Sequence, residues 1–304
     1  MKQFLVKTAL FVLVIATWLI VLVAGSEYLI KQRKDLLLKL NTDIETVFAG
    51  NSAVECAVDD NLIPGSVNIA QSGEAYLYSY AKLKALCNVN KQIKTVFLSF
   101  SFVDPLIEKE ESWLYSDEFI IEKVQYYNYL LDAPEKSFIM RNNPKAYFKG
   151  LTRSVFNSLT SVIKSFTHES PGSQLPNFGG YKYLVRDKLG ADPGEDAGNQ
   201  PAIQKSYQQE KYLIMISEFC RENSIRLVLL NTPKHKSYYE NVDEGILKIW
   251  YDARNLLEQD SLLDLSAYEL PDSCFGDLSH LNYRGTRVFS HYLNETLNQN
   301  PEEN

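Results

Sequence analysis

The sequence contains little of what metal, redox or phosphate chemistry requires. Its 304 residues include only four cysteines and four histidines. The cysteines lack the paired short spacing of a zinc site; they stand at Cys56, Cys87, Cys220 and Cys274. We expect isolated buried thiols, although export from the cytoplasm would permit a disulfide whose pairing the sequence does not reveal. Because the sequence also has no glycine-rich phosphate loop and no cluster of metal-ligating residues, we expect neither a metal nor a cofactor.

Positive charge is also scarce. The 31 lysines and arginines are outnumbered by 38 aspartates and glutamates, which gives a net charge of -7. No dense run of lysine and arginine interrupts this balance. A protein that binds nucleic acid needs a basic surface to neutralise phosphates, so the composition excludes a nucleic-acid partner.

Charge is absent from one stretch near the N-terminus. Thr8 to Gly25 is uncharged and is just long enough to span a bilayer. We interpret residues 1–30 as an uncleaved membrane anchor. A cleaved signal peptide is the alternative, because Val-Ala-Gly before Ser26 resembles a cleavage site. The anchor predicts a single-pass protein of the inner (cytoplasmic) membrane whose large C-terminal domain faces the periplasm or the outside.

Beyond the anchor, short apolar strands alternate with helices. Residues 31–43 are predicted to form a helical stem and residues 44–304 one domain, with a mostly helical insertion at about 102–200. The predicted strands are 44–49, 66–70, 94–101, 225–231 and 262–265, and the predicted helices are 74–88, 202–223, 242–259 and 282–298. Such alternation is typical of parallel strands buried on both faces by crossover helices. It predicts an α/β fold with a three-layer doubly wound parallel sheet.

Ser52 stands where the first predicted strand turns into a helix. Gly50 permits the tight turn, and the serine then lies at the carboxyl edge of the sheet, where doubly wound folds bind ligands. Its backbone N–H would lie at a helix N-terminus, which stabilises a developing oxyanion. A plain helix cap is the alternative role for this serine.

Asp277 and His280 lie in the loop before the last predicted helix, on the same expected sheet edge as Ser52. A serine hydroxyl needs a base within hydrogen-bond reach, and histidine is the usual one. A carboxylate then fixes the tautomer and orientation of the imidazole. Together the three residues predict a Ser-His-Asp triad; the alternative is that Asp277 caps a turn and His280 packs against the helix.

These segments resemble the SGNH (GDSL-type) hydrolase superfamily. Gly50-Asn51-Ser52 matches its Gly-Asp-Ser nucleophile motif, and Asp277-Leu278-Ser279-His280 matches its closing Asp-x-x-His motif. The resemblance implies the flavodoxin-like SGNH hydrolase fold and an oxyanion hole built from the backbone N–H groups of Ser52 and Gly73. The chain departs from the family in two places: Asn51 replaces the motif aspartate, and the Gly-x-Asn block after the third strand is missing. We expect Asn231, at the end of the fourth strand, to substitute for the missing asparagine.

The anchor and the segment from His280 to Gly285 are similar to membrane-anchored SGNH-like proteins of cell-envelope polymer O-acylation. Those proteins act beside a multispanning membrane-bound O-acyltransferase. The resemblance implies a serine-dependent O-acyl esterase or O-acyltransferase acting on cell-envelope glycan or polymer outside the cytoplasm. The alternative is a catalytically decayed SGNH-like partner protein that docks such an acyltransferase or binds glycan.

Overall fold

The sheet at the centre of the protein is parallel throughout. The computed structural model describes residues 1–167, 178–186, 189 and 203–299. In this part of the chain, five strands form one sheet in the order β2-β1-β3-β4-β5. The strands are β1 (Thr46–Ala49), β2 (Ser66–Asn68), β3 (Thr95–Ser99), β4 (Arg226–Asn231) and β5 (Ser261–Asp264).

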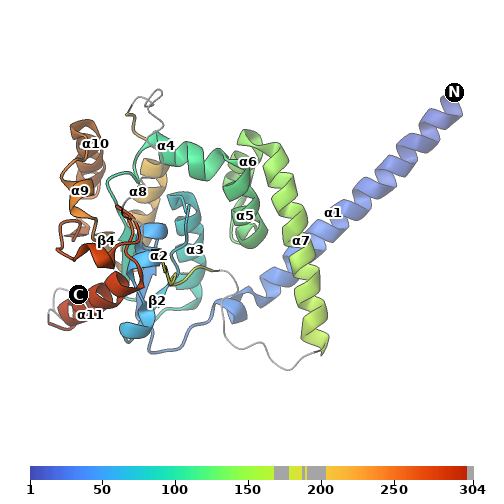
Figure 1. Ribbon diagram of the computed structural model, residues 1–304. Helices are drawn as coiled ribbons and strands as arrows, with labels where there is room; N and C mark the ends of the chain where they lie inside the picture. The colour runs from blue at the N-terminus through green and yellow to red at the C-terminus, as the bar shows by residue number, and fades with distance from the viewer. Residues whose placement is uncertain (168–177, 187–188, 190–202, 300–304) are drawn as a thin grey trace.

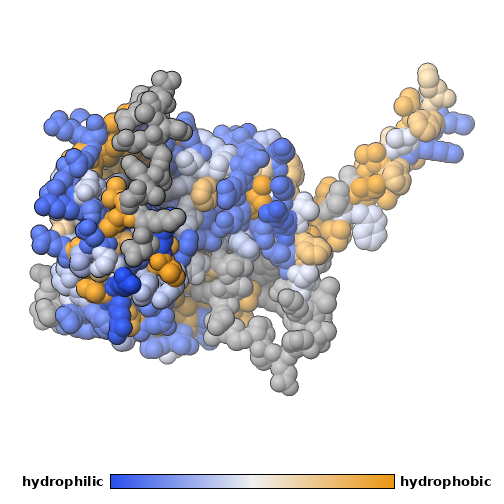
Figure 2. Space-filling model, viewed as in Figure 1, coloured by the Kyte–Doolittle hydropathy of each residue, from blue (hydrophilic) through white to orange (hydrophobic). Residues whose placement is uncertain are grey.

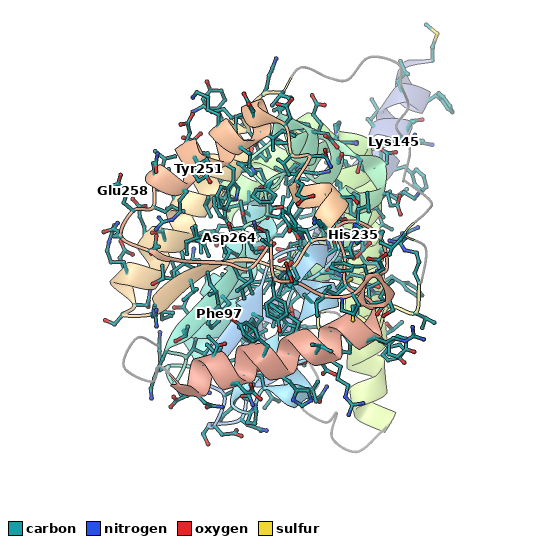
Figure 3. The ribbon with its side chains drawn as sticks, turned by 60° about the vertical axis from the view of Figure 1, so that its left-hand side comes forward. Phe97, Lys145, His235, Tyr251, Glu258 and Asp264 are labelled. Carbon is teal, nitrogen blue, oxygen red and sulfur yellow. The ribbon has the colours of Figure 1, made fainter. Side chains whose placement is uncertain are left out.

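Both faces of this sheet are buried because successive side chains of a strand point to opposite sides. Val47, Val96 and Leu229 belong to one core cluster, which is covered by α3 (Tyr76–Val89), α8 (Tyr207–Glu222) and α10 (Glu244–Asn255). Phe48, Phe97 and Val228 belong to the opposite cluster, which is covered by α2 (Ser52–Ala57) and α11 (Tyr283–Gln299). Figure 3 shows α11 crossing the sheet on the side where Phe97 lies. The predicted three-layer α/β fold is confirmed.

The strand order places the chemistry-bearing turns together. The chain leaves β1 for the edge strand β2 and then returns across β1 to β3, so the connections after β1 and β3 run in opposite directions. Ligands bind at this kind of switch point, beyond the carboxyl ends of the strands. Ser52 follows β1, and Asn231 is the last residue of β4, two strands away at the same edge.

The N-terminal helix projects from the domain. Helix α1 (Lys2–Leu38) continues without a break through most of the predicted stem. Its segment Gln3–Leu29 is long enough and apolar enough to cross a membrane, a property that an anchor shares with a signal sequence. Figure 2 shows this projecting segment mostly in the colour of hydrophobic residues, beside a largely hydrophilic domain. The division into anchor, stem and domain stays a prediction.

The described part of the insertion is mostly helical. It contains α4 (Ile107–Glu110), a π-helical turn (Glu111–Tyr115), α5 (Asp117–Tyr127), α6 (Ala133–Asn142) and α7 (Pro144–Thr167). Residues 168–177, 187–188 and 190–202 lie outside the described residues. Figure 1 shows α7 crossing α1 near the point where α1 leaves the domain. The insertion therefore packs against the projecting helix α1.

Candidate active site

Ser52 is positioned by a tight turn after β1. Gly50 has a φ of +116°, and a side chain there would place its Cβ 2.4 Å from the Cβ of Ser99. Glycine fits this left-handed and crowded position without strain. Asn51 caps α2, because its Oδ1 accepts a 2.9 Å hydrogen bond from the backbone N–H of Ala53. The capping role open to Ser52 thus belongs to Asn51, and the hydroxyl of Ser52 is left for another partner.

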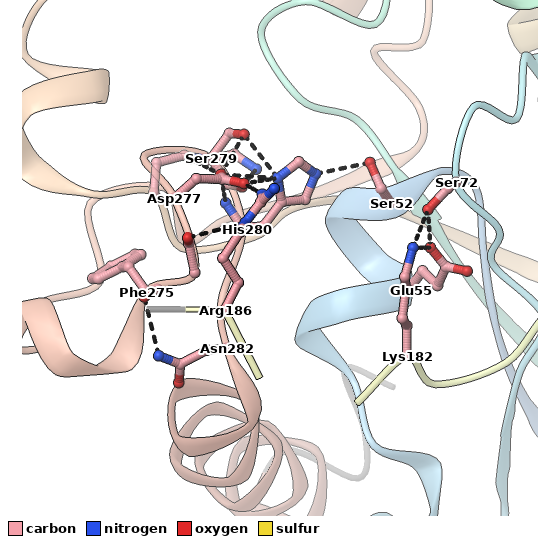
Figure 4. Close-up of polar contacts among 12 residues, drawn as sticks. Ser52, Glu55, Ser72, Lys182, Arg186, Phe275, Asp277, Ser279, His280 and Asn282 are labelled. Atoms are coloured by element: carbon pink, nitrogen blue, oxygen red, sulfur yellow. Dashed lines mark hydrogen bonds and ion pairs between the residues drawn. The ribbon is translucent and has the colours of Figure 1, made fainter. Parts of the chain in front are cut away.

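That partner is His280. Its ring Nε2 lies 2.8 Å from Oγ of Ser52, and its ring Nδ1 lies 2.9 Å from Oδ1 of Asp277 (Figure 4). An ionised carboxylate only accepts hydrogen bonds, so Nδ1 carries the proton and Nε2 is free to accept the Ser52 hydroxyl. The structure therefore brings the three residues singled out from the sequence into one hydrogen-bonded chain.

The loop around Asp277 fixes the carboxylate and the imidazole relative to each other. Oδ1 of Asp277 accepts hydrogen bonds of 2.9 Å from the backbone N–H groups of both Ser279 and His280. The carbonyl of His280 in turn accepts a 2.9 Å hydrogen bond from the backbone N–H of Gly276. This buried carboxylate is therefore held by the backbone of its own loop, which keeps it within reach of the ring.

A segment of the insertion, residues 178–186, runs past the site and contributes a side chain that the sequence did not indicate. Its Arg186 forms an ion pair with Oδ2 of Asp277 and donates a 3.2 Å hydrogen bond to the carbonyl of Gly276. The backbone N–H of Lys182 donates to the carbonyl of Glu55 at 2.8 Å, which ties the segment to α2. Figure 4 shows Lys182 and Arg186 on either side of the site.

The electrostatics of the site keep His280 neutral. Burial lowers the pKa of its imidazole to about 3, and the positive charges of Lys234 and Arg186 act in the same direction. A neutral imidazole at physiological pH is the form that can accept a proton from a serine hydroxyl. A pKa this low also makes the ring a weak base. The site therefore keeps the imidazole neutral at the expense of its basicity.

Lys234 is a second residue that sequence analysis missed. It is buried, and its Nζ donates a 3.0 Å hydrogen bond to the carbonyl of Ser279 and a 3.3 Å hydrogen bond to Oγ1 of Thr232. Burial lowers its pKa to about 8, while the carboxylate of Asp104 opposes that shift. The lysine therefore holds the loop of Asp277 and His280 and brings positive charge next to His280.

The turn after β2 carries Gly73, the expected backbone donor of the oxyanion hole. Gly73 has a φ of +62°, and a Cβ there would overlap the ring of Phe119. The neighbouring Ser72 donates its hydroxyl to the carboxylate of Glu55 in α2, and its carbonyl accepts a 3.0 Å hydrogen bond from Nζ of Lys123 in α5. The turn is thus held between the insertion and α2, the helix that begins with Ser52 (Figure 4).

Asn231 has a property that is rare for a buried amide. It is 0% exposed, and within the described part of the chain neither its Nδ2 nor its Oδ1 has a hydrogen-bond partner. Each such group costs roughly 1–3 kcal/mol when left unpaired in the protein interior. Among the described residues, Asn231 therefore has a free amide donor at the carboxyl edge of the sheet, which the role expected of it as an oxyanion donor requires.

The position after β3, where that family asparagine would stand, is occupied by a network around Asp104. This buried carboxylate accepts hydrogen bonds from Nδ2 of Asn51 at 2.8 Å and from the backbone N–H and the hydroxyl of Ser101, each at 2.7 Å. Burial raises its pKa. An aspartate at position 51 would bring a second carboxylate to hydrogen-bond distance of this one. The network therefore gives a physical reason for the asparagine in the nucleophile motif.

The cysteines supply no second nucleophile. All four cysteines are buried and free. Burial raises the pKa of Cys56, four residues after Ser52, to about 11, so its thiolate is not populated at neutral pH. Within the residues that the structure describes, no group of three histidine, cysteine or acidic side chains could hold a metal ion.

Comparisons with known proteins find a partial family match and a distant structural likeness. A protein-family model matches residues 202–302, which are less than half of the chain and include Asn231, Asp277 and His280. No curated protein matches the sequence. The fold is similar to a crystal structure from Bacteroides fragilis whose protein carries a provisional acylhydrolase name, at 11% identity and a TM-score of 0.39, over 89% of this chain and 94% of that one. So distant a likeness leaves the function to be argued from the site itself.

Proposed function

We propose that the protein is a serine-dependent O-acyl esterase or O-acyltransferase of the SGNH type. The observation that supports this most is the 2.8 Å contact between Nε2 of His280 and Oγ of Ser52, with Asp277 behind the ring. This is the arrangement of nucleophile, base and orienting carboxylate that activates a serine hydroxyl.

The reaction follows from these roles. Oγ of Ser52 attacks the carbonyl carbon of an acyl ester while Nε2 of His280 takes its proton. The tetrahedral intermediate collapses, the bond to the alcohol oxygen breaks, and His280 returns the proton to that oxygen as it leaves. Water or a polymer hydroxyl then attacks the acyl-serine while His280 takes its proton. The bond to Oγ of Ser52 breaks, and His280 returns the proton to Oγ.

The negative charge of the intermediate requires donors. We assign this role to the backbone N–H groups of Ser52 and Gly73 and to Nδ2 of Asn231. The buried and unpaired amide of Asn231 supports its assignment, because an oxyanion would supply the acceptor that Nδ2 lacks among the described residues. Removing one donor of this kind typically slows catalysis roughly 10²- to 10³-fold.

A polar cavity connected to the Ser52 turn through Gln71 supports a hydroxyl-rich acceptor such as a cell-envelope glycan. Its volume is about 440 Å³, and it is lined by Gln71, Glu118, Glu122, Gln125, Tyr126 and Arg153. The backbone N–H of Gln71 donates a 2.9 Å hydrogen bond to the carbonyl of Gly50, so one wall of the cavity is joined to the turn that positions Ser52. Carboxylates, amides and a tyrosine are groups that bind sugar hydroxyls.

The apolar helix Gln3–Leu29 supports a place at the membrane. On this proposal the protein is a single-pass protein of the inner membrane, its domain faces the periplasm or the outside, and it works beside a multispanning membrane-bound O-acyltransferase. The low pKa of His280 and the absence of the third family block favour, as the second candidate, a decayed protein that docks such a partner or binds glycan without chemistry.

A fluorophosphonate probe separates the two candidates. The full chain should be phosphonylated at Ser52 and should hydrolyse 4-nitrophenyl acetate. Ser52→Ala should lose labelling and slow hydrolysis roughly 10⁴-fold or more. Ser237→Ala, which changes an exposed serine outside the site, should leave both intact. Full activity of Ser52→Ala would refute the proposed mechanism, and a native chain that resists the probe would identify the decayed partner.

A further inference from the structure

One surface of the insertion has the opposite charge to the rest of the protein. Residues 136–167, which cover most of α6 and all of α7, contain six lysines and arginines and no aspartate or glutamate, although the chain as a whole carries a net charge of -7. The basic residues are Lys136, Arg141, Lys145, Lys149, Arg153 and Lys164. Such a concentration of one sign in an acidic protein points to an anionic partner.

Large apolar side chains stand among these charges, on the side of α7 that faces solvent. Phe148 is 55% exposed and Phe156 is 67% exposed. Ala146 and Gly150, each two residues from Phe148, are buried on the opposite side of the helix, and Gly150 is packed against Val124 of α5. Exposed phenylalanines interleaved with lysines are typical of helices that lie in a membrane interface.

The fold places this surface at the level where α1 would leave a bilayer. Glu27 lies near the end of the apolar segment Gln3–Leu29, and its carboxylate accepts a 2.8 Å hydrogen bond from Nζ of Lys136 in α6. The same carboxylate accepts a hydrogen bond from Nδ2 of Asn128, just after α5. Figure 1 shows α7 crossing α1 in this region. If α1 spans a membrane, the α6–α7 surface therefore lies against the headgroups.

We propose that the α6–α7 surface, made by Arg141, Lys145, Phe148, Lys149 and Phe156, binds the surface of a bilayer that contains anionic lipid. The lysines and Arg141 contact lipid phosphates, and the two phenylalanines enter the boundary between headgroups and acyl chains. This contact holds the domain in one orientation on the membrane, which a single spanning helix alone does not do. It is independent of the chemistry proposed for Ser52.

A depth measurement on the full chain tests this surface. A fluorophore attached to Phe148→Cys or Phe156→Cys in nanodiscs should be quenched by nitroxide-labelled lipids when phosphatidylglycerol is present. Labelling is selective because the native cysteines are buried. The same fluorophore on Tyr251→Cys serves as the control, since Tyr251 is exposed and lies on the side of the molecule opposite Lys145 (Figure 3). Quenching at positions 148 and 156 should exceed that at 251 at least about threefold.

Charge reversal tests the lipid specificity. Each basic side chain near an anionic surface favours contact by roughly fivefold, so Lys145→Glu combined with Lys149→Glu should reduce the quenching to the level of pure phosphatidylcholine discs. Lys236→Glu combined with Lys248→Glu changes two exposed lysines of α9 (Lys236–Tyr239) and α10 and should have no effect. Equal quenching at 148, 156 and 251, or quenching that ignores both phosphatidylglycerol and charge reversal, would overturn the proposal. So would quenching that appears only after a membrane protein partner is added.

Discussion

Asp277→Asn separates the catalytic role of the carboxylate from its structural one. The asparagine keeps the shape of the side chain and leaves an oxygen for the backbone N–H groups of Ser279 and His280, which now bond to Oδ1 at 2.9 Å. It loses the charge that stabilises the imidazolium. Its amide also allows the tautomer with the proton on Nε2, which cannot accept the Ser52 proton. The same substitution in a serine protease triad lowers kcat about 10⁴-fold, which is about 5.5 kcal/mol of transition-state stabilisation.

The expected cost in folding stability is much smaller. The lost ion pair is with Arg186, whose side chain is 48% exposed, so it contributes no more than about 1 kcal/mol. Weakening the hydrogen bonds to the former carboxylate adds roughly 1–2 kcal/mol. Phosphonylation of Ser52 and hydrolysis of 4-nitrophenyl acetate should therefore fall by orders of magnitude while the thermal unfolding transition moves by a few degrees.

The matched control is Asp272→Asn. Asp272 lies 3.2 Å from Nε2 of His235 and is 81% exposed, so this second aspartate–histidine pair lies outside the proposed triad. Its amide variant should retain the native rate. An Asp277→Asn variant that phosphonylates within about tenfold of the native rate would show that the carboxylate does not serve the histidine as proposed.

Three further substitutions test the surroundings of the triad. Lys234→Met removes a charge that lowers the pKa of His280, so the acidic limb of the pH–rate profile should move to higher pH from its native position near the pKa of about 3; an unchanged limb would contradict this. Asn231→Leu should raise the free energy of unfolding or leave it unchanged, because an unpaired buried amide is removed, yet slow deacylation roughly 10²-fold. Gly73→Ala should destabilise the fold by roughly 2–4 kcal/mol in chemical denaturation, and Phe119→Ala should restore part of the loss.

The strands were predictable because burial on both faces leaves a plain signal in the sequence. In β4, Leu227 to Leu230 is continuously apolar, and the structure uses alternate residues for the two core clusters. The meeting of Ser52 with His280 was predictable for a related reason. Parallel strands bring all turns after their carboxyl ends to one edge, so residues 228 positions apart in the chain become neighbours.

The residues that hold the triad in place were not predictable, because nothing in the sequence around them indicates which side chains they contact. Lys234 is one of two lysines in Pro-Lys-His-Lys, and only the packing of the loop decides that it is buried while Lys236 is exposed. Arg186 reaches Asp277 from an insertion with no regular pattern. The amide of Asn51 is paired with the buried carboxylate of Asp104, a partner 53 positions away that no local pattern indicates.

Helix α5 connects the turn that carries Gly73 with the α6–α7 surface. Its Lys123 is buried and donates a 3.0 Å hydrogen bond to the carbonyl of Ser72, next to Gly73. Just after α5, Nδ2 of Asn128 donates a hydrogen bond to Glu27 of α1, and α7 packs against α5 through Gly150. A displacement of the α6–α7 surface would therefore act, through α5, on the turn that carries Gly73. An oxyanion donor works only when its N–H lies within hydrogen-bond distance of the developing charge, so the role proposed for Gly73 predicts that the packing of the insertion affects the rate of the proposed reaction.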